Sequence, residues 1–545
     1  MSLEFNTVQV NRPKRNYFEM NHDRKFSFQI GMLVPIMCQE VLPGDKFSVV
    51  NEQLLRFAPL LAPIMHRIDV YTHYFFVPNR ILWSNWEEFI TGNQGESPSP
   101  AFPYVNIVNN VDNVPLVGQG SVGDYLGIPS TKITVGETPV NTQVSALPLA
   151  AYHKIWNEYY RDQNLQDEID TDLIDGDNSS NLSVTYRDMP QLRAWEHDYF
   201  TSALPWTQKG EEVFLTFETE ANIPVDIDFI PTGSTQFGIN GIQPDGYNVD
   251  GSPVFTGTAD FDTGKYPLLQ KFYNGVDDSE FIPLRVDNSE QLEGNLDLSG
   301  AYLMTVNELR KAMAIQRWLE LNARGGSRYI ETILAHFGVK SSDARLQRPE
   351  YLGGGKSNVA ISEVLQMSQS DTTPQGTMSG HGINYGTSHE FSKFFEEHGY
   401  IIGIISVMPK TAYQDGLPKH FQKFDKLDYY WSTFAHLGEQ EIKNKELYIN
   451  SDDREGTFGY VPRYSEYKFI PSTVHGDFRG NLDFWHMGRI FDEQPALNGD
   501  FITCDFESIN RAFAVQDGTH NLWCHLYQRV KAIRPIPVYS TPRIY

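Results

Sequence analysis

The chain has 545 residues, of which 40% are hydrophobic and 13% aromatic, so it can bury a large core and is not generally disordered. Its formal net charge of -25 excludes a general attraction of the whole surface to nucleic acid, so any DNA contact must be local. The longest apolar run, residues 401–407, is too short to cross a bilayer, and no signal-peptide pattern opens the chain. We therefore expect a folded protein that is made and kept in the cytosol, without membrane insertion.

The first 25 residues combine basic side chains with turn-forming residues and show no sustained apolar period. This pattern predicts an extended basic N-terminal arm over residues 1–25. The basic residues of this arm are Arg12, Lys14, Arg15, Arg24 and Lys25.

Short β-type runs separated by turn signals follow the arm. Apolar and polar positions partly alternate over residues 26–36, a Pro-Gly-Asp turn occupies residues 43–45, and residues 47–55 and 68–77 read as strands. Further strands are predicted near the C-terminus, at residues 401–407, 460–470 and 521–533. This distribution is typical of an antiparallel sandwich or barrel.

Helical periodicity is found in three separate places, at residues 79–90, 149–163 and 306–323. Strands and helices do not alternate regularly, which disfavours a parallel α/β sheet. We therefore expect an all-β fold into which a few helices are inserted.

Long segments rich in Gly, Asn, Pro or acidic residues indicate surface excursions at residues 93–143, 167–181 and 211–300. The third is long enough for a small subdomain on the surface. The predicted organisation is an arm at 1–25, a first part of the β-fold with helical insertions at 26–210, a surface insertion at 211–300, and the remainder of the β-fold with a basic C-terminal end at 301–545.

Motifs that could carry catalysis or metal binding are incomplete. GGGKS at 353–357 lacks the first glycine of a phosphate-binding loop, and the acidic run at 170–177 is out of register with a calcium loop. Acid and base pairs could be drawn from His197 with Asp198, or from Glu396 and Glu397 with His398, but no nucleophile motif accompanies them. We predict no catalytic residues, no metal and no cofactor.

The three cysteines, Cys38, Cys504 and Cys524, are too scattered for a disulfide framework or a zinc cage. We expect them to be buried thiols.

The composition keeps one class of function open as an alternative to a purely structural role. Many aromatic and acidic residues are compatible with an all-β carbohydrate-active enzyme or glycan-binding protein.

A series of unusual aromatic-rich strings runs along the chain in order. The strings are LPGDKF (42–47), FAPLLAPIM (57–65), YFFVPNRILW (74–83), LPLAAY (147–152), IWNEYYRDQN (155–164), DYFTSALPWTQKG (198–210), RPEYLGG (348–354), EHGYIIG (397–403) and FGYVPRY (458–464). Together they resemble the major capsid proteins of microviruses, especially the gokushovirus-like branch of these small single-stranded DNA bacteriophages. The resemblance covers most of the chain, and 211–300 is the clear gap.

The resemblance implies an eight-stranded antiparallel jelly roll with long loop insertions. It also implies sixty copies in an icosahedral virion around a single-stranded DNA genome, assembly in the bacterial host cytoplasm, and a small basic DNA-binding phage protein as a partner. Some members of the branch carry a three-fold protrusion formed by a long insertion. Residues 211–300 are the candidate for it here, and outward loops of this kind would attach to a receptor on the host cell surface.

For DNA contact, the arm residues are joined by basic residues near the C-terminus, where residues 518–545 contain no Asp or Glu. The full candidate set is Arg12, Lys14, Arg15, Arg24, Lys25, Arg529, Lys531 and Arg534. The neighbouring aromatic residues Tyr17, Phe18 and Trp523 could stack on unpaired bases. An equally open interpretation is that this basic end binds an acidic surface of a neighbouring subunit.

Overall fold

The computed structural model describes residues 14–91, 99–106, 117–129, 142–180, 189–211, 213, 225–229, 246–247, 253–254, 292–296, 306–365 and 378–539. The chain divides into two compact units, one made of Met1–Glu211 with Trp318–Tyr545 and the other of Glu212–Arg317. The two largest antiparallel sheets of the first unit share one core.

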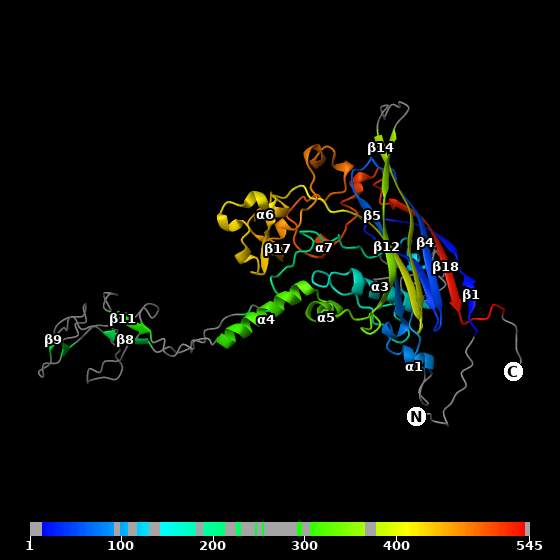
Figure 1. Ribbon diagram of the computed structural model, residues 1–545, viewed down its shortest axis with the longest axis horizontal. Coiled ribbons are helices and arrows are strands. Elements are labelled where there is room, and N and C mark those ends of the chain that lie inside the picture. The colour runs from blue at the N-terminus through cyan, green and yellow to red at the C-terminus, as the bar shows by residue number, and fades with distance from the viewer. Residues whose placement is uncertain are drawn as a thin grey trace, which may run out of the picture. The chain divides into compact units, whose positions relative to one another are not determined.

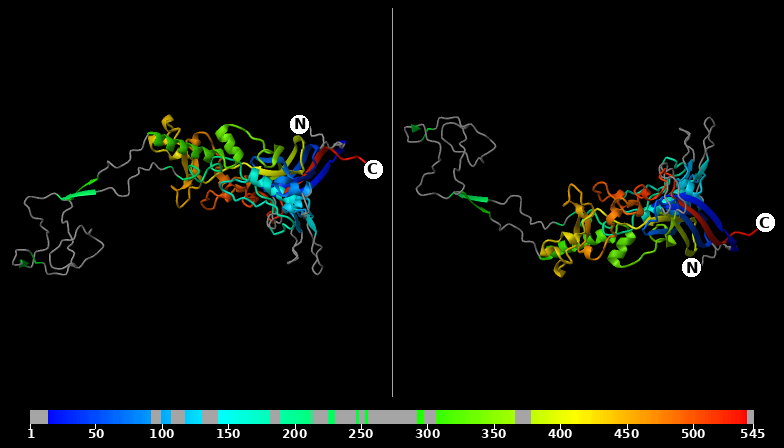
Figure 2. Two further views of the ribbon diagram at one scale, coloured as in Figure 1. Left: turned by 90° about the horizontal axis from the view of Figure 1, so that it is seen from below. Right: turned by 90° about the horizontal axis from the view of Figure 1, so that it is seen from above.

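The larger sheet has six strands in the order β1-β18-β4-β14-β13, with β2 also paired to β18. Its long strands lie side by side in Figure 1, and the blue N-terminal strands run along the red C-terminal strand in both views of Figure 2. Buried and exposed side chains alternate along β18, as expected for a strand with one face on the core and one face open. The strands are β1 (Asn16–Glu19), β2 (His22–Phe28), β4 (Lys46–Phe57), β13 (Ala360–Leu365), β14 (Met378–Phe394) and β18 (Leu522–Arg534).

The smaller sheet has four strands in the order β12-β5-β15-β3. All but one residue of β5 and all but one of β15 are buried, which explains why both strands are nearly continuous apolar runs in the sequence. The strands are β3 (Val34–Val41), β5 (Ile68–Pro78), β12 (Glu350–Asn358) and β15 (Gly399–Pro409).

The main hydrophobic core lies between the two sheets. It combines Phe28, Phe47 and Leu526 of the larger sheet with Tyr74 and Ile405 of the smaller sheet, all of them essentially inaccessible to solvent. At about 25 cal/mol per Å² of apolar surface, this burial is the main force that holds the sheets together.

A second core covers the other face of the smaller sheet. There α3 (Leu147–Ile155) packs its apolar side chains, such as Leu149, against Phe75 of β5 and Ile402 of β15. The remaining elements of this region are η1 (Asn79–Ile81), α1 (Trp86–Thr91), β6 (Tyr104–Asn106), α2 (Val122–Leu126), β7 (Gln143–Ser145) and η2 (Trp156–Tyr160).

The chain between β15 and β18 forms a lobe with a third core, in which Ile442 and Phe501 of the lobe pack with Phe200 from an earlier stretch of the chain. Its regular elements are short, and many are single 3-10 turns. They are η5 (Lys419–Gln422), η6 (Lys426–Asp428), η7 (Ser432–Phe434), β16 (Glu439–Lys443), α6 (Asn444–Leu447), β17 (Thr457–Pro462), η8 (Ser465–Tyr467), η9 (Gly476–Arg479), η10 (Asp483–Trp485), α7 (Gly499–Ile502) and η11 (Asn510–Ala512).

Among the described residues, the rest of the chain contributes two helices and four short strands. The boundary between the two compact units falls within α4 (Val306–Gly325), and α5 (Tyr329–Phe337) follows it. The second unit contains β8 (Val225–Phe229), β9 (Gly246–Tyr247), β10 (Pro253–Val254) and β11 (Leu292–Leu296), paired as β8 with β11 and β9 with β10.

The expectation of an all-β fold with antiparallel sheets and a few helices is confirmed. Three strand or helix boundaries need correction. The strand expected over 26–36 is interrupted by a turn at Gly31, where φ is 86°, and β17 ends at Pro462 before a 3-10 turn instead of continuing to 470. The helix expected over 79–90 begins as the 3-10 turn η1 and becomes α-helical only at Trp86.

Candidate nucleic-acid interface

The larger sheet presents an open face that points away from the core. On β18 the exposed positions include Trp523, His525, Arg529 and Lys531, because their neighbours Cys524, Leu526, Val530 and Ala532 point inward and are buried. We call the surface formed by these exposed positions and their neighbours on β1, β2, β4 and β14 the open face.

Strand register brings basic residues of three strands together on the open face. Lys25 of β2 lies opposite His525, and Arg56 of β4 lies opposite Trp523. Lys46 of β4 lies opposite Ile533, at the other end of the same strand pair. Directly opposed side chains in an antiparallel pair are about 5 Å apart, so these groups form one continuous surface.

The open face is locally basic on a chain that is acidic as a whole. On β1, β2, β4 and β18, five cations stand against three carboxylates, a balance of 5 - 3 = +2 with His525 neutral. The cations are Lys25, Lys46, Arg56, Arg529 and Lys531, and the carboxylates are Glu19, Asp23 and Glu52. Arg529 forms an ion pair with Glu52, and His525 lies 3.3 Å from Asp23.

The predicted DNA-binding residues are divided between this face and structural positions. Lys25, Arg529 and Lys531 share the open face, and Lys14 and Arg15 are exposed where the described chain begins. The guanidinium of Arg15 lies 4.9 Å from the ring centre of Phe394. Arg12 lies outside the described residues.

Arg24 and Arg534 form hydrogen bonds and ion pairs with other groups of the same chain. Arg24 donates a hydrogen bond to the backbone carbonyl of Tyr125 at 2.5 Å, and burial lowers its pKa. Arg534 lies 2.9 Å from Asp45, a carboxylate with no solvent exposure, and also donates to the carbonyl of Glu40. The first contact ties β2 to α2, and the second holds the end of β18 in position.

Aromatic rings lie on the same face as the cations. Trp523 is 49% exposed, Tyr17 is 50% exposed, and Tyr385 of β14 is 73% exposed. Phe18, the other aromatic candidate, is half-buried on the inward side of β1 opposite Ala532. Sequence reasoning missed Tyr385, Lys46 and Arg56, although the alternation of β4 alone was enough to place its two basic residues on one face.

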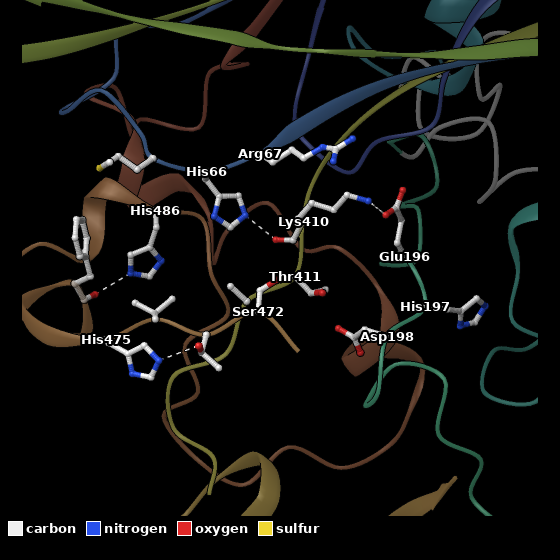
Figure 3. Close-up of a pocket in the computed structure, with 15 residues that line it drawn as sticks. His66, Arg67, Glu196, His197, Asp198, Lys410, Thr411, Ser472, His475 and His486 are labelled. Carbon is white, nitrogen blue, oxygen red and sulfur yellow. Dashed lines mark hydrogen bonds and ion pairs between the residues drawn. The ribbon is translucent and has the colours of Figure 1, made fainter. Parts of the chain in front are cut away.

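A cavity of about 700 Å³ beside the sandwich is lined by several histidines, which raises the question of catalysis. Three of the imidazoles are engaged in structural hydrogen bonds (Figure 3): His66 with the carbonyl of Lys410, His475 with Thr473, and His486 with the carbonyl of Phe478. Burial lowers the pKa of His66 to about 4, so this ring is neutral at pH 7.

The acid and base pair that could be drawn from His197 and Asp198 is not assembled. In Figure 3 the ring of His197 points away from Asp198. Asp198 accepts hydrogen bonds from the backbone nitrogens of Phe200 and Thr201 and, at 2.7 Å, from the hydroxyl of Tyr413. Its carboxylate therefore organises the turn that follows it.

Glu397 and His398, from the second candidate acid and base pair, also contact other side chains of the protein. Glu397 forms an ion pair with Arg80 at 2.6 Å, while the ring of His398 packs at 5.6 Å against Trp86. Glu396 is exposed.

The glycine-rich string at 353–357 lies within β12, which is a strand and not a phosphate-binding loop. Its lysine, Lys356, lies 2.7 Å from the buried carboxylate of Asp69 and 3.3 Å from Glu196. In the acidic loop, Asp175 accepts hydrogen bonds from Trp83 and Asn85. Across the part of the chain that the structure describes, no cluster of three or more His, Cys, Asp or Glu residues could hold a metal ion.

The cysteines are free thiols, with Cys504 and Cys524 buried and Cys38 half-buried. Burial raises the pKa of Cys38 and of Cys524 to about 12, so neither is a reactive thiolate at pH 7. None of the helices in the described ranges has the length and apolar character needed to span a bilayer.

Comparison with known proteins gives a consistent result. Residues 6–544 match the model of the family described as capsid protein (F protein). The capsid protein VP1 of Chlamydia phage 1 is 38% identical over 600 residues, covering 99% of this chain and 98% of the relative.

Two further relatives are similar over their full lengths. The capsid protein VP1 of Bdellovibrio phage phiMH2K is 35% identical, with 97% of this chain and 96% of the relative covered. The capsid protein VP1 of Spiroplasma virus 4 is 30% identical, with 99% and 97% covered. The resemblance carried by the aromatic strings is thus confirmed, and the chain belongs to the capsid protein (F protein) family as a major capsid protein of the microvirus type.

Proposed function

We propose that copies of this chain assemble into a closed icosahedral shell of sixty subunits, the container of a virion built in the cytoplasm of a bacterial host. The observation that carries the proposal is the family match over residues 6–544. In this proposal the role is structural and involves no catalysis, which agrees with the structural hydrogen bonds made by His66, His486 and Asp198. The carbohydrate-active alternative is supported by composition alone.

An eight-stranded jelly roll is the fold that we propose for the subunit. Two features support it: the strand orders β2-β18-β4-β14 and β12-β5-β15-β3, and the way in which the chain alternates between the two sheets. Successive strands β2, β3, β4 and β5 lie in the larger, smaller, larger and smaller sheet. With β13 set aside as the hairpin partner of β14, strands β12, β14, β15 and β18 repeat the alternation in reverse order. Such sandwiches are rigid while their loops vary freely in length.

Electron microscopy of the purified chain tests the shell directly. We expect uniform particles whose averaged images show icosahedral symmetry with sixty equivalent subunits. In a closed point-group assembly each copy buries the same contact surface. A chain that stays monomeric under every assembly condition, including high salt that screens the net charge of -25, would contradict the proposal.

The open face of the larger sheet is the surface that we propose for contact with the single-stranded genome. Cations that attract phosphates and exposed rings that stack on bases are the two components of sequence-independent binding to single strands. Lys25, Arg529 and Lys531 come from the predicted set, and Lys46 and Arg56 join them. Because the chain carries a charge of -25, neutralising the genome also calls for the small basic phage protein as a partner.

Removing cations from the open face should weaken both the binding of single-stranded DNA and the salt dependence of that binding. The test uses the triple variant Lys25→Ala, Arg56→Ala, Lys531→Ala. We expect the magnitude of the negative slope of log K against log salt concentration to decrease by about 0.7 for each phosphate that the protein no longer neutralises. Fluorescence anisotropy with a labelled oligonucleotide measures this slope. Trp523→Ala is expected to weaken binding by about 5- to 150-fold, because a base can no longer stack on the indole ring.

A matched triple variant controls for the overall change in charge. Lys340, Arg345 and Lys468 are exposed cations on other parts of the chain, and their replacement by alanine removes the same charge. Equal decreases of affinity in the two triple variants would show that the open face has no special role.

We propose that the insertion at 211–300 attaches the particle to the host cell. We also propose that it forms the protrusion at the three-fold axes. The support is that Glu212–Arg317 forms a compact unit of its own and that the family-like strings lapse in this stretch. Particles lacking 211–300 are expected to form but to lose adsorption to host cells. Unchanged adsorption by these particles, measured as phage remaining in the supernatant, would contradict the assignment.

A further inference from the structure

The lobe between β15 and β18 carries an unusual concentration of exposed apolar side chains. Phe424 is 92% exposed and Ile470 is 95% exposed, and the side chains around them are each at least half exposed. We call this set the aromatic patch; its members are Phe421, Phe424, Leu427, Tyr429, Tyr430, Trp431, Leu437, Tyr467, Phe469 and Ile470.

The patch is one surface, although its residues come from two stretches of the chain. Tyr430 lies with its ring centre 6.2 Å from that of Tyr467, and its backbone nitrogen donates to the Tyr467 hydroxyl at 3.3 Å. The ammonium of Lys423 lies 3.9 Å from the centre of the Tyr467 ring. These contacts bring the turns η5, η6 and η7 against η8.

Hydrogen bonds hold the backbone beneath the patch in one conformation. The carboxylate of Asp428 accepts from the backbone nitrogens of Phe424 at 2.9 Å and Asp425 at 2.8 Å. Trp431 donates its indole N–H to the carbonyl of Lys426 at 2.8 Å. Rings that are already ordered lose little entropy on binding, so the patch is pre-organised for contact.

The size of the patch argues that another molecule covers it. Fully burying an aromatic side chain removes on the order of 150–250 Å² from solvent. A set of this size, at half exposure or more, amounts to roughly 1,000 Å². A typical monomer exposes no apolar patch above about 300–600 Å², whereas a stable interface buries about 800 Å² on each partner.

Charge complementarity favours a second copy of this chain as the partner, because the patch is locally positive and the chain as a whole is acidic. Two copies that each carry a charge of -25 repel one another over most of their surfaces. Across residues 419–437, however, Lys419, Lys423 and Lys426 stand against Asp425 and Asp428, a balance of 3 - 2 = +1. Contact here hides apolar surface without bringing like charges together.

A cavity of about 780 Å³ adjoins the patch and completes the surface. Phe421, Phe469 and Ile470 of the patch line it together with Tyr413 of the lobe and Tyr199. A protruding apolar side chain and an apolar hollow thus occur side by side on the same lobe. A neighbouring copy can insert its own side chains into such a hollow.

We propose that the aromatic patch, with the adjoining cavity, is a contact surface between neighbouring copies of this chain in the shell. The inference rests on the proposed shell and names one surface that builds it. Each copy hides its patch only when it is assembled, so burial of these rings drives association.

The double variant Phe424→Ser, Ile470→Ser tests the inference with little risk to the fold, because both side chains are almost fully exposed. We expect the yield of particles, measured by sedimentation and electron microscopy, to fall at least tenfold while the circular dichroism spectrum and melting temperature of the free subunit stay unchanged. Phe337→Ser on α5, where the ring is 76% exposed, is the matched control and should assemble normally.

The possible results separate the two proposals. Particles at normal yield from the double variant would overturn the patch while leaving the shell intact. An equal decrease of particles in the Phe337→Ser control would also overturn it, because the effect would then come from any exposed ring. A wild-type chain that forms no particles at all overturns the shell itself.

Discussion

Replacing Asp45 by alanine is expected to lower the free energy of unfolding by about 3–5 kcal/mol, because it leaves the Arg534 guanidinium without its partner. Asp45 has no solvent exposure and lies 2.9 Å from Arg534 at the end of β18. Its carboxylate also accepts a hydrogen bond from the backbone nitrogen of Leu42 at 2.8 Å, which closes the turn before β4. Urea denaturation followed by tryptophan fluorescence measures the change.

The ion pair between Arg529 and Glu52 provides the control. The Arg529 side chain is 53% exposed, and a pair in solvent contributes at most about 1 kcal/mol, so Arg529→Ala should leave stability nearly unchanged. If Asp45→Ala unfolded at the same urea concentration as the wild type, Arg534 would have no structural role. Arg534 would then return to the candidates for DNA contact.

Phe57→Ala should have an effect of similar size, about 3–5 kcal/mol, because it opens a cavity in the core of the larger sheet. Phe57 is 1% exposed, and its ring centre lies 6.1 Å from that of Phe513. It also covers Gly382 of β14, where an added Cβ would come within 2.7 Å of the Phe57 ring.

This close approach allows a double-mutant test. Gly382→Val alone is expected to cost about 1–3 kcal/mol by overpacking. In the double variant the valine occupies part of the space left by Phe57→Ala, so the combined cost should be smaller than the sum of the single costs. Strictly additive costs would mean that the two side chains do not share this space. Gly386→Val is a control, since its nearest neighbour is the Ser357 hydroxyl at 3.1 Å.

The strands that sequence reasoning predicted are those whose apolar residues are continuous or alternate. Residues 68–77 and 401–407 correspond to β5 and β15, which are buried along nearly their whole length. Residues 521–533 correspond to β18, whose buried and exposed side chains alternate almost perfectly. In these segments the local pattern and the tertiary environment agree, so the sequence was sufficient.

Strands rich in glycine were missed for a physical reason. In β12 and β14 glycines are needed because other chain segments pass close to the backbone: a Cβ at Gly354 would lie 2.5 Å from the carbonyl of Thr72, and one at Gly380 would lie 2.3 Å from that of Ala62. Glycine in a sequence ordinarily indicates a turn, and only the packed structure shows that it permits close approach here.

The candidate DNA-contact residues were predictable only as a set of charges. Alternation along β18 places Lys531 and Arg534 on opposite faces, but nothing in the sequence shows that Asp45 holds Arg534 or which basic residues of other strands lie beside Lys531. Strand register makes the difference, because it decides which basic side chains of β2, β4 and β18 lie side by side. Register depends on pairing between residues about 500 positions apart, beyond any local pattern.

The position of β18 between β2 and β4 has a consequence for synthesis of the chain. β2 and β4 are synthesised early in translation. The strand that pairs with both of them, β18, begins only at Leu522. Until translation is nearly finished, their edges have no partner to pair with. We therefore expect that chains terminated before Leu522 cannot complete the larger sheet and do not enter particles.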